Sequence, residues 1–445
     1  MIPVLEPEAV LEVPFEPSPH TRDRAFKVVG KLDGAPAPIE ERLGRAAAGA
    51  LLIWGAYTLQ ASAQLPTHTY LVPLSLGLYA CGFFALISAA VSSPLSAFRR
   101  QAITWVITTA ILGSVALNAY ASIAIQNPRY GTDGIALGQM AVEHVLAGIN
   151  PYTITVDASE LRALGVPLNS LTQTTSGEFI PNSLSYPALS FLDFVPFFAA
   201  GLHDLRWTVL LFELASLIVV VAAVPWKVRL WALIAIVADI NLSIYFVSGS
   251  VVDWIWVLPL LLMLVSIKRG KWTTAAVFLG IAAATKQQSW FLIPFLAVWL
   301  YTYLSGSVQP IKRMVKFFSI AFGVFLLPNI PFLLLNGHAW YASVVAPLFQ
   351  PPDGQGLSTL GQFSMIRMSE ATYSAIFAGA AVILFAGYVL YRKSAPSAAW
   401  ILPAVVLWFS HRSFQSYFVY WTPIFVLGLA LEQELRRRIP GRLNA

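Results

Sequence analysis

The sequence predicts a bundle of transmembrane helices, and two observations support this fold class. The chain of 445 residues is 57% hydrophobic and 11% charged, with a mean hydropathy of +0.68, a composition typical of polytopic membrane proteins. Apolar runs of about 20 residues, which is enough to cross roughly 30 Å of hydrocarbon, recur after residue 45. These runs lack the alternating pattern of a barrel strand, and backbone amides in hydrocarbon must pair internally, so we expect an all-α fold.

The first 45 residues differ from the rest of the chain. They contain prolines and mixed charges but few large apolar side chains, and they show no short hydrophobic core followed by a small-residue cleavage site. We therefore expect residues 1–45 to form a disordered cytoplasmic tail without a signal peptide. Residues 433–445 are expected to form a second, basic cytoplasmic tail. The net charge of +6 gives no indication of nucleic-acid binding.

Between residues 46 and 432 the apolar runs predict one transmembrane domain of about twelve helices. The predicted helices are 46–63, 69–92, 102–125, 206–224, 230–247, 251–267, 273–286, 289–304, 317–335, 371–391, 397–410 and 416–432. A further apolar run, 186–202, is short and is interrupted by Pro187 and Pro196. We expect it to be a broken, shallow or re-entrant helix, because irregular backbone is tolerated at membrane depth only where protein or water satisfies it.

Basic residues predict the orientation of this bundle. They gather in clusters that the helix count places at one end, which the positive-inside rule makes the cytoplasmic end. The clusters are Arg22 to Arg45, Arg99-Arg100, Lys227 and Arg229, Lys268-Arg269 with Lys271, Lys312-Arg313 with Lys316, Arg392-Lys393, and Arg436 to Arg438. The outer end carries the two longest loops, 126–185 and 336–370. Function is expected there, because most other connections are short.

One acidic residue in the first outer loop is a candidate functional residue. Asp133 follows the third predicted helix by only a few residues, where hydrocarbon gives way to the outer polar layer. Gly131 and Gly134 flank it and permit a tight turn and the close approach of another molecule. The alternative is a helix cap, because an aspartate before a segment with helical periodicity is a common N-terminal signal.

The segment after Asp133, IALGQMAVEHVLAGI, has apolar residues at helical spacing and stops at Gly148. It predicts an amphipathic helix lying on the membrane interface, with Tyr152 as an interfacial anchor. Glu143 and His144 lie on this helix. A surface or packing role for His144 is favoured over metal ligation, because no HxxxH, CxxC or DxD spacing accompanies it.

Four motifs in this order resemble the GT-C glycosyltransferases, and in particular the branch of polyprenyl-phosphate-mannose-dependent, PimE-like mannosyltransferases. The matching residues are Gly131-Thr132-Asp133, Gly148-Ile149-Asn150-Pro151-Tyr152, Tyr186-Pro187-Ala188-Leu189, and Gly280-Ile281-Ala282-Ala283-Ala284-Thr285-Lys286-Gln287-Gln288. The similarity extends over residues 102–432. The two predicted helices before residue 93 are additional to the pattern of that family.

The resemblance implies a GT-C-like bundle that moves a sugar from a polyprenyl phosphate carrier to a hydroxyl acceptor at the non-cytoplasmic face, and the plasma membrane is the expected location. It makes mannose the expected sugar, although arabinose or glucose donors would suit the same mechanism. The expected acceptor is a glycolipid or glycan. Asp133 would be the general base, because a positioned carboxylate accelerates attack by a hydroxyl about 10²- to 10⁴-fold. One base suits direct displacement with inversion. No cofactor is expected, and a divalent metal is not favoured.

An anionic lipid phosphate would be the leaving group, so the site needs fixed positive charge or hydrogen-bond donors. Lys286 ends an apolar helix in ATKQQSW, and the amide donors Gln287 and Gln288 follow it. Lysine binds phosphate as a point charge. The alternative is a lysine whose long side chain extends to the membrane interface without binding a ligand.

A second cationic candidate lies in WFSHRSFQSYFVYW, where His411 and Arg412 interrupt an apolar stretch at the same predicted end as Asp133. Arg412 suits a phosphate because guanidinium binds it through two hydrogen bonds, and His411 is a further donor. The alternative is a structural ion pair of Arg412 with Glu370 or Asp253. Asp253 is also a candidate to orient Lys286, or else it is a helix cap.

Further contacts with the substrate are expected from residues near these motifs and from the second outer loop. That loop, 336–370, is rich in glycine, proline and small polar residues after Phe349, as a mobile cover over a cavity would be. The candidates are Tyr152, Tyr186, Glu143, His144 and Arg367.

Two other functions remain open: a transporter or flippase of lipid-linked glycans, and a glycan–lipid ligase. A transporter predicts critical charges near the bilayer midplane, whereas the candidates here lie toward the outer end. A ligase predicts several arginines or histidines in its large outer loop, and residues 336–370 contain only Arg367 and His338. The expected partners are the lipid-phosphate sugar donor, the acceptor and the bilayer, without nucleic acid.

Overall fold

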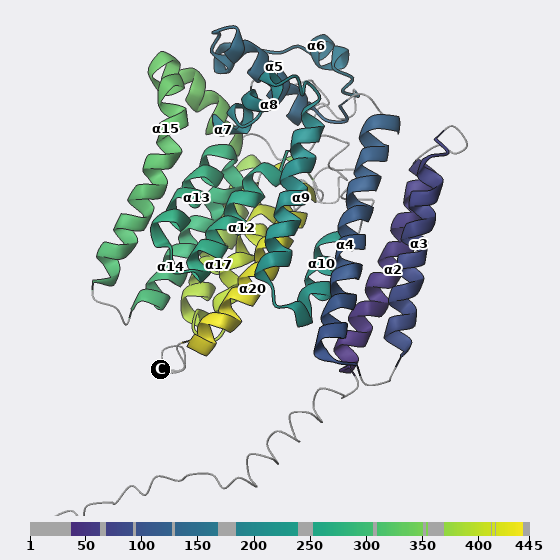
Figure 1. Ribbon diagram of the computed structural model, residues 1–445. Helices are drawn as coiled ribbons and strands as arrows, with labels where there is room; N and C mark the ends of the chain where they lie inside the picture. Colours follow the sequence, from purple (N-terminus) through teal and green to yellow (C-terminus); the bar gives the residue numbers. More distant parts are fainter. Residues whose placement is uncertain are drawn as a thin grey trace, which may run out of the picture.

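The computed structural model describes residues 37–62, 68–91, 95–126, 130–167, 184–238, 252–305, 309–349, 353–354, 369–410, 412–413 and 415–438. The long helices stand side by side, and the short helices α5 to α8 lie across one end of them (Figure 1). We name this end, which carries α5 to α8, the cap end. The opposite end is the basic end, where α15 begins and α17 ends (Figure 1); Lys312 lies in the first turn of α15, and Arg392 follows α17.

The described helices fall into three consecutive parts of the chain. The first part of the chain forms α2 (Ile39–Ser62), α3 (Leu71–Ala90), α4 (Ala97–Ala121), the π-helical turn η1 (Ser122–Gln126), α5 (Asp133–Leu146), η2 (Pro151–Thr153), α6 (Ala158–Ala163), α7 (Leu189–Leu192) and α8 (Val195–Ala199). The middle part forms α9 (Leu205–Ala223), η4 (Trp226–Val228), α10 (Arg229–Val237), α12 (Trp254–Lys268), α13 (Trp272–Thr285), η5 (Gln287–Phe291) and α14 (Leu292–Leu304). The last part forms α15 (Pro310–Val344), η6 (Ala346–Phe349), α17 (Glu370–Tyr391), η7 (Pro396–Trp400), α18 (Leu402–Trp408), α19 (Gln415–Val419) and α20 (Trp421–Arg438).

The helical membrane fold is confirmed, although five helices of the described chain, rather than twelve, are both long and apolar enough to cross a membrane by themselves. These are Leu71–Ala90, Ala97–Ile125, Leu205–Ala223, Pro310–Phe349 and Ala371–Tyr391. Each of the twelve predicted segments does contain helix. Several of those helices are shorter than a full crossing because breaks divide them, as at Lys286, where α13 ends and a 3-10 helix follows.

The hydrophobic core is centred on α12, which packs against α9, α13 and α20. Most of its side chains are buried, on all sides of the helix. A helix that is apolar all round belongs inside a bundle rather than at its surface. The residue that precedes it, Asp253, is therefore drawn into the interior as well.

The prediction of a tail through residue 45 is wrong at its end, because α2 begins at Ile39. Glu40 and Glu41 lie in its first turn, where negative charge stabilises a helix N-terminus. Arg45 is fully buried and forms an ion pair with Glu41, while Arg42 donates to the Ala89 carbonyl at 2.8 Å. The Arg42 contact joins the start of α2 to the end of α3. At the other terminus α20 continues to Arg438, into the predicted basic tail.

The boundary of the second outer loop is also different from the prediction. Helix α15 continues past residue 335 to Val344, with non-helical backbone angles at Asn336, and η6 follows it. Asn336 accepts a hydrogen bond from the Ala339 amide at 3.0 Å, so it restarts the helix after the kink. Farther on, β1 (Asp353–Gly354) pairs in parallel with β2 (Arg412–Ser413), so two predicted outer segments meet through their backbones.

The broken helix expected at 186–202 consists of α7 and α8, which the two prolines delimit. Pro187 precedes α7, and Pro196 occupies the first turn of α8, a position that proline tolerates. Both helices contact α5 at the cap end. Asn329 of α15 secures this segment, because its Oδ1 accepts from the Ala188 amide at 3.1 Å and from the Trp340 indole at 2.9 Å.

Gly280 lets α13 and α15 approach each other closely, so an added methyl group should be destabilising there. A β-carbon at Gly280 would lie 2.4 Å from the Ala321 carbonyl oxygen and 2.6 Å from Val324 Cβ. We predict that Gly280→Ala lowers the free energy of unfolding by about 1–3 kcal/mol, as overpacking does, in a thermal unfolding assay of detergent-purified protein. Gly323→Ala is the matched control, since its β-carbon would meet nothing within 4 Å. Equal stability of the two variants would contradict this packing.

Candidate functional site

A buried ion pair lies at the break between α13 and η5. Lys286 Nζ is 2.7 Å from Asp253 Oδ1, and the two residues are 3% and 0% exposed. The backbone of Lys286 is extended (φ −153°, ψ 140°), which ends α13 and turns the side chain away from the helix axis. Lys286 therefore does not extend to the membrane interface, and that alternative is wrong.

Aromatic side chains enclose this ion pair. The Trp256 indole donates to Asp253 Oδ1 at 2.6 Å. Lys286 Nζ lies 5.0 Å from the ring centroid of Tyr186 and 5.4 Å from that of Tyr417, within the range of cation–π attraction, which contributes about 2 kcal/mol at desolvated sites. Asp253 Oδ2 is buried without a hydrogen-bond partner among the described residues. The helix-cap alternative for Asp253 is also wrong, because its side chain makes no cap bond to α12.

The two glutamines after Lys286 are buried rather than exposed to a ligand in this structure. Gln287 Nε2 donates to the Ser185 carbonyl at 2.7 Å and to the Val344 carbonyl at 2.8 Å. It thereby joins the chain before Tyr186 to the end of α15. Gln288 is 5% exposed, and its Oε1 has no hydrogen-bond partner in the described part of the chain.

Tyr152 is part of the protein interior, so its prediction as an interfacial anchor is wrong. Its hydroxyl donates to the Tyr186 carbonyl at 2.9 Å. Its ring packs edge-on against Phe191 and Phe332, with centroids 5.9 and 5.3 Å away. Tyr152 thus fixes the backbone of Tyr186, whose ring covers Lys286.

Asp133 is the first residue of α5 and is half-buried. The predicted helix after it is confirmed, and Thr132 rather than Asp133 occupies the N-cap position. A β-carbon at the next residue, Gly134, would lie 4.0 Å from the Tyr186 hydroxyl. The start of α5 therefore meets the aromatic ring that covers Lys286, and residues far apart in sequence converge at the cap end.

A polar network holds α5 against the start of α9. The Tyr130 hydroxyl donates to Gln139 Oε1 at 2.6 Å and accepts from the Leu205 amide at 3.2 Å. Burial raises the pKa of Tyr130 to about 12, so its hydroxyl stays protonated and keeps both roles at neutral pH. Gln139 in turn donates to Glu143 at 2.8 Å.

The other predicted substrate contacts receive less support from the geometry. The hydrogen bond of Glu143 is with Gln139, and His144 Nδ1 is 2.7 Å from the Met140 carbonyl, so these two contacts lie within α5. Arg367 and His411 lie outside the described residues. The backbone of Arg412 is described in β2, but its side chain is not.

Several residues at the site had no signal in the sequence. Tyr417 has no predicted role, yet it is 7% exposed and faces Lys286. Trp256 and Tyr130 belong to no motif. Asp193, which the sequence leaves without a role, interacts with the side chain of Thr285, the residue before Lys286. Of these residues, Tyr417 reaches the ion pair only through the three-dimensional arrangement of the helices.

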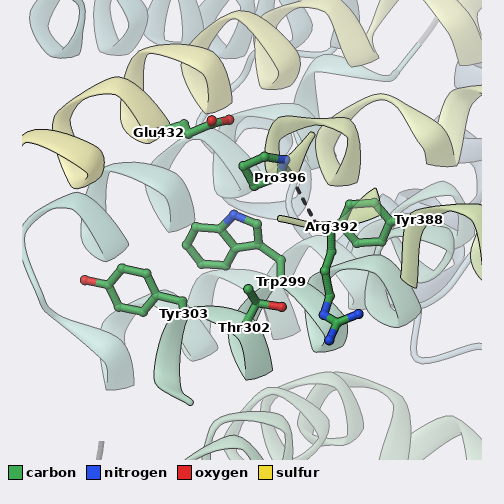
Figure 2. Close-up of a pocket in the computed structure, with 7 residues that line it drawn as sticks. All are labelled: Trp299, Thr302, Tyr303, Tyr388, Arg392, Pro396 and Glu432. Atoms are coloured by element: carbon green, nitrogen blue, oxygen red, sulfur yellow. Dashed lines mark hydrogen bonds between the residues drawn. The ribbon is translucent and has the colours of Figure 1, made fainter. Parts of the chain in front are cut away.

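A separate cavity lies at the basic end (Figure 2). It is about 20 Å³ in volume and is lined by Trp299, Thr302, Tyr303, Tyr388, Arg392, Pro396 and Glu432. This space holds about one water molecule and is too small for a sugar. Within the described ranges, no group of three or more histidine, cysteine, aspartate or glutamate side chains is placed to hold a metal ion.

No protein family, curated protein or solved structure matches this chain. The resemblance to GT-C glycosyltransferases therefore depends on the motifs of the sequence alone.

The buried ion pair should contribute to stability only as a pair. Asp253→Asn or Lys286→Met leaves one buried charge without its partner, which typically costs about 3–5 kcal/mol. We predict that each single variant unfolds at a clearly lower temperature than the wild type, and that Asp253→Asn with Lys286→Met together recovers much of the loss. Thermal unfolding of the four proteins gives the coupling energy. Additive effects of the two substitutions would contradict a direct interaction.

Proposed function

We propose that this chain is a membrane glycosyltransferase that moves a sugar, with mannose as the first candidate, from a polyprenyl phosphate to a hydroxyl acceptor. The reaction would take place at the cap end, which is the non-cytoplasmic face if the basic end is cytoplasmic. The proposal includes a GT-C-like arrangement of about twelve crossings. Helix in all twelve predicted segments supports it, although only five helices are individually long enough to span.

One observation carries the proposal: the first turn of α5, with Asp133, meets the tyrosine that covers the buried cation Lys286. A β-carbon at Gly134 would lie 4.0 Å from the Tyr186 hydroxyl, and the Tyr186 ring centroid is 5.0 Å from Lys286 Nζ. Sugar transfer from a lipid phosphate needs a base for the acceptor hydroxyl and a cation for the departing phosphate. The geometry brings one candidate for each role to the same end of the bundle.

In the proposed mechanism, Asp133 accepts the proton of the acceptor hydroxyl while its oxygen forms the new bond to the anomeric carbon. The bond from that carbon to the phosphate oxygen breaks on the opposite face, so the configuration inverts. Lys286 stabilises the negative charge of the lipid phosphate as it leaves. Asp253 and Trp256 hold Lys286 in position and do not touch the sugar.

The same ion pair favours transport of an anionic lipid as the second candidate function. Paired charges inside a helical bundle are typical of transport pathways, where they bind and release a substrate or ion. The two functions differ in their product. A transporter moves a labelled lipid-linked sugar between leaflets without breaking its sugar–phosphate bond, whereas a transferase releases the polyprenyl phosphate.

Replacement of Asp133 tests the transferase directly. We predict that Asp133→Asn lowers the rate of label transfer from radiolabelled polyprenyl-phosphate mannose to endogenous membrane acceptors by about 10²- to 10⁴-fold, because the amide cannot take the acceptor proton. The measurement uses membranes that contain equal amounts of each variant, with thermal unfolding to establish that each protein is folded.

Asp157→Asn is the matched control at the same end of the bundle. Asp157 is exposed and caps α6 by accepting from the Ser159 and Glu160 amides, and asparagine caps helices about equally well. Its variant should transfer label at the wild-type rate. Full activity of folded Asp133→Asn would rule out the proposed base.

A further inference from the structure

Two adjoining cavities at the basic end share a pair of cations. One, of about 220 Å³, is lined mainly by apolar side chains of α13, α14 and α15; its lining residues are Trp272, Thr273, Leu300, Leu304, Arg313, Lys316, Phe317 and Ile320. The other, of about 320 Å³, is lined by Gln309, Lys312, Arg313 and Lys316. Arg313 and Lys316 belong to both, so an apolar chamber opens beside a cationic cup.

The crossing of α13 and α15 accounts for the apolar chamber. The two helices touch where Gly280 meets the Ala321 carbonyl. Trp272 and Arg313 each lie eight residues before this contact and line the chamber. Two straight helices that cross at one point move apart with distance from the crossing. The end of α14 lies beside the resulting space between α13 and α15 and fills only part of it. The chamber is therefore a consequence of backbone geometry.

The cup is positive for two independent reasons. Lys312, Arg313 and Lys316 are exposed in the first two turns of α15, and the helix N-terminus adds a partial positive charge. No acidic residue lies in that first turn, and no side chain caps it. Cations at a helix N-terminus are unfavourable in water, whereas an anion in the cup would satisfy both the helix and the side chains.

We propose that these cavities bind one anionic glycerophospholipid of the bilayer, with its phosphate in the cup of Lys312, Arg313 and Lys316 and the start of an acyl chain in the chamber. The ligand must be amphipathic, because the two cavities share a wall and differ in chemistry. Exposed apolar side chains on the same helix, such as Val315 and Phe322, both 59% exposed, support a bilayer lipid as the occupant. This inference is independent of the proposed sugar transfer.

The test measures binding of phosphatidylglycerol to the full-length, delipidated protein in detergent, by native mass spectrometry and by thermal unfolding. Phosphatidylcholine with the same acyl chains is the neutral comparison, and sn-glycerol 3-phosphate is the soluble phosphate without chains. We expect the wild type to prefer phosphatidylglycerol. Arg313→Gln with Lys316→Gln should weaken that binding roughly thirtyfold, which corresponds to about 1 kcal/mol for each cation removed.

Two further variants distinguish lipid binding in the cup from nonspecific electrostatic attraction and from an effect on folding. Arg99→Gln with Lys227→Gln removes two exposed cations of other predicted basic clusters and should leave the lipid preference unchanged. Thr273→Trp fills the chamber without changing charge and should weaken both phospholipids. The proposal is overturned if Arg313→Gln with Lys316→Gln keeps the wild-type preference, if the control pair loses as much of it, or if glycerol phosphate alone stabilises the protein as strongly as the phospholipid.

Discussion

The contact between Lys286 and Asp253 is the constraint on which the geometry of the cap end depends. Removal of two charges from water costs several kcal/mol per ion even after relaxation, and the pair offsets this only while the ions stay in contact. At 2.7 Å, with both side chains buried, they do. The end of α13 must therefore stay beside the start of α12, and α12 is the most enclosed helix of the core. The ion pair thus fixes a polar centre against a rigid apolar support.

The neighbouring contacts extend that constraint to the surface of the cap end. Gln287 links the residue after Lys286 to the chain before Tyr186 and to the end of α15. Tyr152 fixes the carbonyl of Tyr186, and Gly134 brings α5 to the hydroxyl of the same ring. A displacement of the lysine would therefore disturb α5 through two intermediate contacts. This is why a half-buried carboxylate on a short helix can have a defined position relative to a buried cation.

The sequence predicted the elements of this arrangement better than their contacts. Periodicity located α5 to within a few residues, and the break at Lys286 followed from the change from apolar to polar residues. The sequence left the partner of Lys286 undecided. Asp253 is 33 residues away, and a single sequence does not specify which helices pack together. Tyr417 has no predicted role for the same reason, because a single sequence does not show that its ring lies beside Lys286. The predicted helix 317–335 is shorter than α15 at both ends, because the prediction covers only the apolar run. The helix itself begins before the basic residues Lys312 to Lys316 and continues after the kink at Asn336.

The surroundings of Lys286 indicate how an anion would have to enter. An ammonium group has three donors; one is directed at Asp253, while Tyr186 and Tyr417 present ring faces. A ring face attracts a desolvated cation with about 2 kcal/mol, which is less than the roughly 3–5 kcal/mol lost when a buried ion pair is broken. An arriving phosphate would therefore displace a tyrosine before it displaced Asp253. Of the two rings, Tyr186 has its hydroxyl near the first turn of α5, so its movement would expose the cation on the side of the bundle where Asp133 lies.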